Sequence, residues 1–250
     1  MLISTDTVFR VTLDHGEGTV GTVHDLFFDD QSWEVRYLVV KTGNWLSGRR
    51  VLLPPTVVEQ RDWANHRLQV PLTQQQIKDS PDVDTDKPIS MQKHREIMAY
   101  PYFPPMGGVP LPPPAAVSSP EPESEGDPHL RSAREVTGYD IEATDGPIGS
   151  IKELILDDEG YQHGWWEFRY LVVDTGNWLP GRKVLISPKW ASSVDWSEQK
   201  VQVAMSREMV EGSPEFIPSE PINRRYEEVL YDYYGEPKYW IGHSTTTTPR

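Results

Sequence analysis

Two kinds of hydrophobic pattern each occur twice along the chain, and both predict β-strands. In Thr19–Asp29 and Ile148–Asp157, β-branched and aromatic residues are mixed with polar alternates before two adjacent aspartates, which favours half-buried strands that end in turns. In Trp33–Thr42 and Trp166–Thr175, a central Leu-Val-Val leaves no polar position. We therefore expect these second strands to be buried on both faces near their centres.

Shorter segments complete the predicted β-pattern in each half of the chain. A return strand is predicted at Arg50–Leu53 and at Lys183–Ile186, after a loop whose Gly and Asn residues are typical of turns. A further short strand is predicted at Leu68–Pro71 and at Val201–Ala204. Short strands divided by turn residues are typical of a small, partly open barrel rather than of an α/β nucleotide-binding fold.

Helical signals are few and short. The segment that begins at Thr73 carries a Thr-x-x-Gln capping box and stops before Pro81, which predicts one short helix. Its counterpart in the second half is Ser206–Ser213. Second short helices are expected near Gln92–Met98 and near Asn223–Leu230.

The two halves correspond because the sequence repeats itself. Arg36–Leu52 reads RYLVVKTGNWLSGRRVL and Arg169–Leu185 reads RYLVVDTGNWLPGRKVL, so only three paired positions differ at an offset of 133 residues. Upstream, Val20-Gly21 corresponds to Ile148-Gly149 at an offset of 128 residues. A repeat of this kind predicts two copies of one domain.

The domain boundaries follow from the repeat and from a change of composition. Residues 101–128 contain ten prolines, four acidic side chains and no Lys or Arg, so this stretch cannot build helix or sheet ladders. We expect the first copy at residues 1–100, a Pro-rich acidic linker at 101–130 and the second copy at 131–240. Residues 241–250 are expected to form a disordered tail.

The motifs of the second half resemble those of the PRC-barrel family. This family is named after the cytoplasmic domain of the photosynthetic reaction centre H subunit and includes the C-terminal barrel of a ribosome maturation factor. The motif residues are Gly138-Tyr139, Ala143-Thr144-Asp145-Gly146, Ile148-Gly149, Ile151–Asp157, Arg169–Val173 and Gly181–Leu185. The first half departs at its start, where Asp14-His15-Gly16-Glu17-Gly18 replaces Thr144-Asp145-Gly146. The resemblance implies a mainly β fold of two tandem, partly open barrels, each with one or two short peripheral helices.

Composition narrows the functions that we consider. The chain of 250 residues has no cysteine, which excludes disulfides, thiol catalysis and cysteine-ligated metals. Its formal net charge of −14 argues against direct contact with nucleic acid, because such binding requires neutralised phosphates. The start of the chain has no basic flank before an apolar stretch, and no apolar run reaches the roughly 20 residues of a membrane span. We therefore expect a cytoplasmic protein.

No set of residues predicts catalysis, a cofactor or a metal. The seven histidines form no i, i+4 pair, and none has a counterpart in the other copy. Asp82-x-Asp84-x-Asp86 opens like a calcium loop, but Lys87 and Lys93 stand where that loop requires Gly and Glu. We expect a non-enzymatic protein with no catalytic, cofactor-binding or metal-binding residues.

The repeated Gly-Asn-Trp-Leu-x-Gly-Arg segment is the first candidate docking site. A Trp at a loop tip beside Gly and Arg has the composition of a protein-docking anchor. In the alternative interpretation, Trp45 and Trp178 fold back to plug the barrel ends, and Asn44 and Asn177 take left-handed turn geometry. The candidate residues are Gly43, Asn44, Trp45, Leu46 and Arg49, with Gly176, Asn177, Trp178, Leu179 and Arg182 in the second copy.

The aromatic residues near the end of the second copy are the other candidate. They either pack on the barrel or form an exposed patch. The candidate residues are Tyr231, Tyr233, Tyr234, Tyr239 and Trp240.

These observations predict a protein–protein interaction or assembly-stabilising module whose partner the sequence does not identify. The resemblance to the reaction centre subunit implies one alternative, an accessory subunit associated with a membrane-bound electron-transfer complex. The resemblance to the ribosome maturation factor implies a second, an adaptor of ribosome assembly. A small-ligand-binding barrel is a third alternative, and self-association stays open.

Overall fold

The computed structural model describes residues 1–16, 18–80, 129–159, 166–176 and 180–241. The chain divides into two compact units. Thr5–Arg134 forms one, here called the N-terminal unit. Met1–Ser4 and Glu135–Arg250 together form the other, the C-terminal unit. The predicted linker at 101–130, except for its last two residues, the predicted helix near Gln92–Met98 and the predicted tail beyond position 241 lie outside the described residues.

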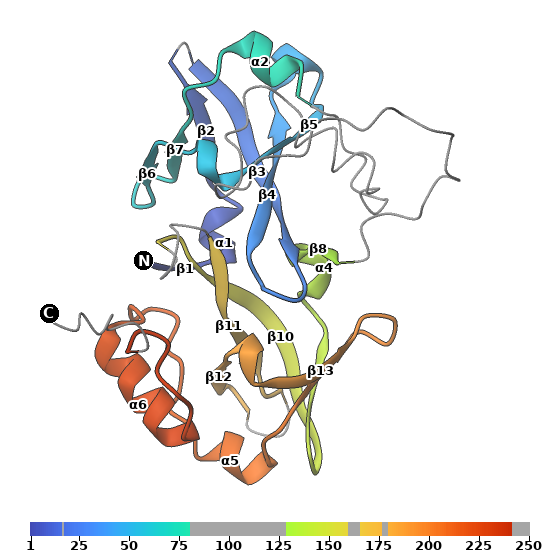
Figure 1. Ribbon diagram of the computed structural model, residues 1–250, viewed down its shortest axis with the longest axis vertical. Coiled ribbons are helices and arrows are strands. Elements are labelled where there is room, and N and C mark those ends of the chain that lie inside the picture. Colours follow the sequence, from blue (N-terminus) through green and yellow to red (C-terminus); the bar gives the residue numbers. More distant parts are fainter. Residues whose placement is uncertain (17, 81–128, 160–165, 177–179, 242–250) are drawn as a thin grey trace, which may run out of the picture. The chain divides into compact units, whose positions relative to one another are not determined.

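The N-terminal unit is built on a seven-stranded sheet (Figure 1). Its strands run in the order β5-β4-β3-β2-β7-β6, and β8 also pairs with β3. The pairing of β2 with β7 is parallel, whereas the others are antiparallel. The strands are β2 (Thr12–His15), β3 (Gly18–Asp29), β4 (Val35–Thr42), β5 (Arg50–Leu53), β6 (Gln60–Asp62), β7 (Arg67–Gln69) and β8 (Leu130–Ser132).

The C-terminal unit repeats this arrangement strand for strand (Figure 1). The order is β12-β11-β10-β9-β14-β13, β1 also pairs with β10, and the pairing of β9 with β14 is again the parallel one. The strands are β1 (Leu2–Ser4), β9 (Asp140–Ala143), β10 (Gly146–Asp157), β11 (Glu167–Asp174), β12 (Lys183–Ile186), β13 (Ala191–Asp195) and β14 (Lys200–Val203). Neither sheet closes on itself, and the predicted mainly β class of partly open barrels is confirmed.

The centre of each sheet is buried as the uninterrupted apolar run predicts. Leu38, Val39 and Val40 of β4 are fully buried, and so are the equivalent residues of β11. A glycine in the long neighbouring strand allows the two strands to approach closely. A Cβ on Gly21 would lie 2.1 Å from the carbonyl oxygen of Lys41, and a Cβ on Gly149 would lie 2.0 Å from that of Asp174. No other residue fits there without moving the backbone.

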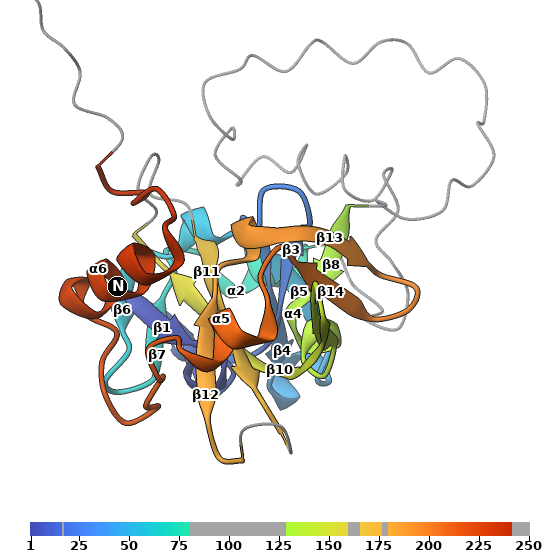
Figure 2. The ribbon, with the colours of Figure 1, turned by 90° about the horizontal axis from the view of Figure 1, so that it is seen from below.

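Helices are short and few, as expected. Near the end of the N-terminal repeat, α2 (Gln74–Lys78) begins at the predicted capping box, in which Thr73 and Gln76 satisfy each other's backbone N–H groups. The C-terminal unit carries α5 (Arg207–Glu211) and the longer α6 (Arg224–Tyr234), which Figure 2 shows in orange and red. The remaining helical turns are α1 (Thr5–Val8), α4 (Ala133–Val136), and the 3-10 turns η1 (Asn44–Leu46), η2 (Pro55–Val57) and η4 (Pro188–Trp190).

The first strand of each copy was not predicted, and its pairing is the main feature that the pattern did not reveal. β1 comes from the start of the chain but pairs with β10, where it is the blue strand beside a yellow one in Figure 1. Conversely, β8 precedes the second copy but pairs with β3. The chain therefore passes from one unit to the other at Ser4–Thr5 and again at Arg134–Glu135.

Candidate functional site

The first docking loop is held against its own barrel. Its tip is the 3-10 turn η1, and the indole Nε1 of Trp45 donates a hydrogen bond to the carbonyl of Val20 at 2.8 Å. The Trp45 side chain is half-buried. The left-handed residue of this loop is Ser47, with φ of 54°, rather than Asn44 as expected. This geometry favours the interpretation of Trp45 as a plug.

The loop arginines bind the end of the following short helix in both units. Arg49 donates from Nη1 to the carbonyl of Lys78 at 2.9 Å and from Nη2 to that of Ser80 at 2.8 Å. Arg182 donates from Nη2 to the carbonyl of Ser213, which is the position equivalent to Ser80. A guanidinium at the C-terminal end of a helix satisfies carbonyls that have no partner within the helix. The repeated arginine therefore has a structural role in each unit.

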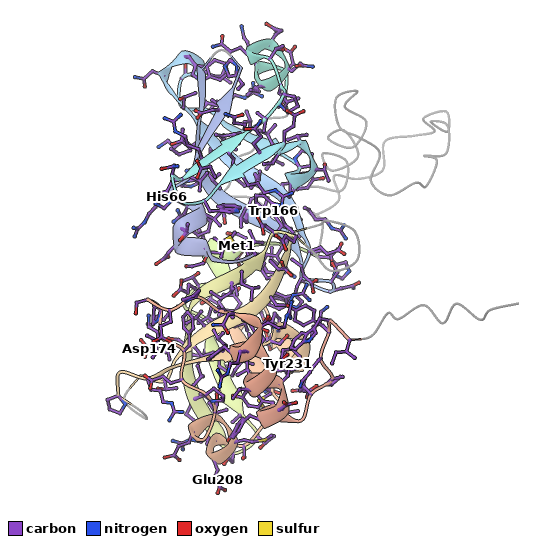
Figure 3. All side chains as sticks on the ribbon, turned by 90° about the vertical axis from the view of Figure 1, so that its left-hand side faces the viewer. Met1, His66, Trp166, Asp174, Glu208 and Tyr231 are labelled. Atoms are coloured by element: carbon purple, nitrogen blue, oxygen red, sulfur yellow. The ribbon has the colours of Figure 1, made fainter. Side chains whose placement is uncertain are left out.

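The second loop is described only at its ends. Asn177, Trp178 and Leu179 lie outside the described residues. The backbone N–H of Gly176 donates to the Asp174 carboxylate at 2.9 Å, and Gly176 has φ of 57°. Asp174 is labelled in Figure 3 at this end of β11.

The aromatic residues of the second candidate form one packed cluster in the C-terminal unit. Tyr231 and Tyr234, on one face of α6, lie with ring centroids 5.1 and 4.9 Å from that of Trp190. Tyr231 also packs edge-on against Trp240 at 5.1 Å, and Tyr239 packs against Trp240 at 4.9 Å. Figure 3 shows Tyr231 among the closely packed side chains beside α6. Tyr231 and Tyr234 are buried, so most of this cluster is core rather than an exposed patch.

A buried carboxylate lies at the centre of this cluster. Glu227 of α6 is 2% exposed and accepts hydrogen bonds from the hydroxyls of Tyr170 at 2.7 Å and Tyr239 at 2.8 Å. Its second oxygen lies 3.0 Å from Nη1 of Arg224. Burial, reinforced by the neighbouring Tyr231 and Glu227, raises the pKa of Tyr170 far above its usual value. The carboxylate therefore always finds hydroxyl donors at this position.

A buried arginine connects the cluster to the sheet. The guanidinium of Arg169, 3% exposed, lies over the ring of Tyr239 at 4.0 Å. It also makes ion pairs of 3.0 Å with Asp157 and with Glu167. A cation that is paired with two carboxylates and stacked on an aromatic ring is compensated for its loss of hydration. The predicted strand residue Glu167 thus serves in an ion pair.

A surface cavity of about 230 Å³ opens beside this network. Its walls include Arg224, Glu227 and Tyr239, together with the carboxylates of Asp157 and Glu159. A second cavity, of about 310 Å³, lies elsewhere in the same unit beside Gly149 and Asp174. Both cavities are lined by charged groups of both signs.

Exposed apolar side chains gather in the segment that follows the second repeat. Apart from Met1, the large apolar residues exposed in the described part of the chain are Ile217, Val229, Tyr233 and Ile241. Val229 is 53% and Tyr233 is 39% exposed, and they lie four residues apart on α6. Residues with this spacing share one face of a helix, so they form a continuous apolar strip.

Sequence reasoning identified the aromatic tail but missed its polar partners. Arg169 and Tyr170 lie inside the repeat, where their identity in both copies indicated a scaffold. Glu227 and Arg224 carry no motif, and only the packing of α6 brings them to β11. Asp82, Asp84 and Asp86 of the calcium-like segment lie outside the described residues. Among the residues described, no group of three or more His, Asp or Glu side chains is arranged to hold a metal ion.

The strand order and the repeated loop define a protein built from two barrels of one type. Residues 12–77 match the family model described as PRC-barrel domain, so this part of the chain is a PRC-barrel domain. The match extends from the first residue of β2 to the penultimate residue of α2 and covers the first docking loop. A search of curated proteins returned no match to the chain. In the part of the chain that the structure describes, no helix has the length and apolar character needed to cross a membrane.

Proposed function

We propose that this chain is a non-enzymatic protein-interaction or assembly-stabilising module that docks through the outer face of α6. The observation that carries the proposal is the exposed strip of Val229 and Tyr233. This strip belongs to the segment after the second repeat rather than to the duplicated framework. The family match supports the general role of a barrel module, and the position of the strip supports the choice of surface.

Tyr233 has the properties of an interface anchor. Its hydroxyl donates to the backbone carbonyl of Met209 at 2.7 Å, which fixes the ring before any partner arrives. Gly212 lies directly below, because a Cβ there would be 2.3 Å from the same hydroxyl. A rigid aromatic side chain contributes contact area at a low cost in conformational entropy.

The strip is bordered by charges of both signs. Arg225, Glu228 and Asp232 are exposed on α6, and Asp232 is paired with Lys238 at 2.7 Å. A charged border around an apolar centre is the usual composition of a reversible protein interface. The partner that fits is a protein with an apolar groove and a polar rim, which receives the helix face through Val229 and Tyr233.

The test compares one partner across matched variants. Full-length protein, Val229→Asp and Thr56→Asp are cross-linked in cells, and the captured proteins are quantified by mass spectrometry. Thr56 is exposed in the N-terminal unit, so this variant carries the same charge change away from α6. We expect the main partner of the parent protein to fall at least tenfold with Val229→Asp and to persist with Thr56→Asp. Equal capture by all three proteins would refute this surface, and substrate turnover by the purified protein would refute the non-enzymatic role.

The cavity beside Arg224 and Glu227 supports a second candidate, a small-ligand-binding barrel. Its walls offer one guanidinium, several carboxylates and the hydroxyl of Tyr239, which suits a polar ligand with both donors and acceptors. Trp240 packs on Tyr239, so a ligand in this cavity should change the indole fluorescence. A metabolite screen that changes the fluorescence of the parent protein but not of Arg224→Ala would favour this function over docking. Association with a membrane complex or with the ribosome remains a matter of partner identity in the cross-linking experiment.

A further inference from the structure

Each sheet contains a short edge site that is filled by the first strand of the other copy. On β3 the site spans Phe27–Asp29, and on β10 it spans Ile155–Asp157. In the first site Leu130 lies opposite Asp29, and in the second Leu2 lies opposite Asp157. These positions correspond at the offset of 128 residues, so the two sites hold their strands in the same register.

The polar contacts in the two sites are also equivalent. The hydroxyl of Ser132 donates to the carboxylate of Asp25, and the hydroxyl of Ser4 donates to that of Glu153. Both carboxylates are buried, at 4% and 8% exposure. A hydroxyl donor is therefore required in the incoming strand at this position, because a buried carboxylate without donors is strongly unfavourable.

The backbone contacts repeat in the same way. Beyond the β8 ladder, the N–H of Asp30 donates to the carbonyl of His129 at 2.8 Å. Beyond the β1 ladder, the N–H of Asp158 donates to the carbonyl of Met1 at 3.2 Å. Both sites thus recognise an extended segment with the pattern Leu-x-Ser, by main-chain pairing and one side-chain hydrogen bond.

The path of the chain makes this recognition reciprocal. Ser80 and His129, on either side of residues 81–128, both belong to the N-terminal unit. If the chain were cut within 81–128, the first fragment would contain β1, which is a strand of the C-terminal unit. The second fragment would contain β8, which is a strand of the N-terminal unit. Neither fragment alone contains a complete sheet of either unit.

We propose that these two edge sites are self-recognition sites, so that a second copy of this chain can supply the complementary repeat. Both sites read the same motif in the same register, so the contacts are identical whether the strand comes from the same chain or from another copy. In the intact chain the covalent connection gives the intramolecular partner an effective concentration of about millimolar. The intact protein is therefore monomeric at micromolar concentration, and copies exchange when the connection is cut. This inference is independent of the proposed docking face on α6.

The experiment cuts the folded, full-length protein. A protease site is inserted between Ser118 and Ser119, and the protein is prepared in normal and in isotopically heavy form. After cleavage we expect the two fragments to elute together in gel filtration. When light and heavy samples are unfolded together in urea and refolded, native mass spectrometry should detect light–heavy complexes in the proportion that random reassortment requires. Fragments that elute separately after cleavage, or that refold only with their original partners, would overturn the proposal.

A second measurement does not depend on refolding. The chain has no cysteine, so a pair introduced at facing positions reports one contact only. In Ile3→Cys with Leu156→Cys, a disulfide should join the two fragments of the cleaved protein, because these positions face each other across β1 and β10. The matched pair is Ile3→Cys with Phe28→Cys, which places the second thiol at the equivalent position of the first copy's own long strand. A disulfide in the matched pair, with none in the first, would show that each copy keeps its own strand and would overturn the proposal.

Discussion

Tyr37 and Tyr170 occupy the same position in the two sheets, and both are buried, but the second is connected to a segment outside the repeat. Tyr170 donates to Glu227 of α6, which in turn binds Tyr239 and Arg224. The duplicated residues therefore build the framework, whereas the residues that follow the second copy add a polar and aromatic layer to it. The difference between the units lies where the repeat ends, and new contacts are expected there.

The largest effect is expected where the two frameworks agree. Replacing Gly21 or Gly149 by Val places a side chain against the backbone of the adjacent strand, at the carbonyl of Lys41 or Asp174. Each substitution should destabilise its unit by about 3 kcal/mol or more, as over-packing in a closely packed site does. The measurement is urea unfolding of the full-length protein. Gly16→Ala is the control, because a Cβ there meets nothing within 4 Å. Tolerance of either valine would show that the close strand crossing is not required.

The next largest effect tests the layer that only the C-terminal unit shows. Glu227→Ala removes the acceptor of the buried Tyr170 hydroxyl and the partner of Arg224. Breaking a buried, hydrogen-bonded charge should cost about 3 kcal/mol. The neighbouring Glu228→Ala is exposed and should change the unfolding free energy by less than about 0.5 kcal/mol. Equal, small losses for both variants would mean that the buried network contributes nothing to stability.

A pH experiment sharpens the same contrast. Burial raises the pKa of Tyr231 and of Tyr234 from the usual 10.0 to about 12. Because the folded-state pKa is raised, the resulting stability is complete below pH 10 and is lost as the pH rises towards 12. Thermal unfolding of the C-terminal unit should therefore weaken in this window. Tyr231→Phe with Tyr234→Phe should lose much of this pH dependence, and an unchanged pH profile would contradict the assignment.

The smallest effect concerns the two strand sites, where the copies are again equivalent. Ser132→Ala and Ser4→Ala each remove one hydroxyl donor to a buried carboxylate, Asp25 or Glu153. Each should lower the unfolding free energy by about 1 kcal/mol, the net value of one such hydrogen bond. Ser219→Ala is the exposed control. If only one of the two serines mattered, the two sites would not be equivalent.

The sequence predicted the strands of the repeat to within a few residues. The Leu-Val-Val runs, the capping box at Thr73 and the return strands follow from local patterns, and local patterns are what periodicity reports. The start of the first strong strand pair differs slightly: β4 begins at Val35, because Trp33 has φ of 62° and stacks on Phe28 at 5.0 Å. The short strands β1 and β8 were missed, since three residues are too few to show an alternation.

The candidate site was predicted only in part. The aromatic tail was found because its composition is unusual, but its role as a packed cluster depends on Trp190, which lies on η4 far from it in the sequence. Glu227 gave no signal, because one carboxylate on an amphipathic helix looks like any solvated residue. Burial of such a group is a property of the surface that it meets, and that surface is formed by β11.

By itself, the sequence determined the duplication, the mainly β class and the position of the loop arginines, since these depend on side-chain periodicity and on repetition at a constant offset. The tertiary structure alone decided which copy each first strand completes. A strand of pattern Leu-x-Ser fits the edge of β3 and of β10 equally well, because both edges present a buried carboxylate in the same register. The choice between two chemically equivalent sites depends on the path of the whole chain, and no local pattern encodes that path.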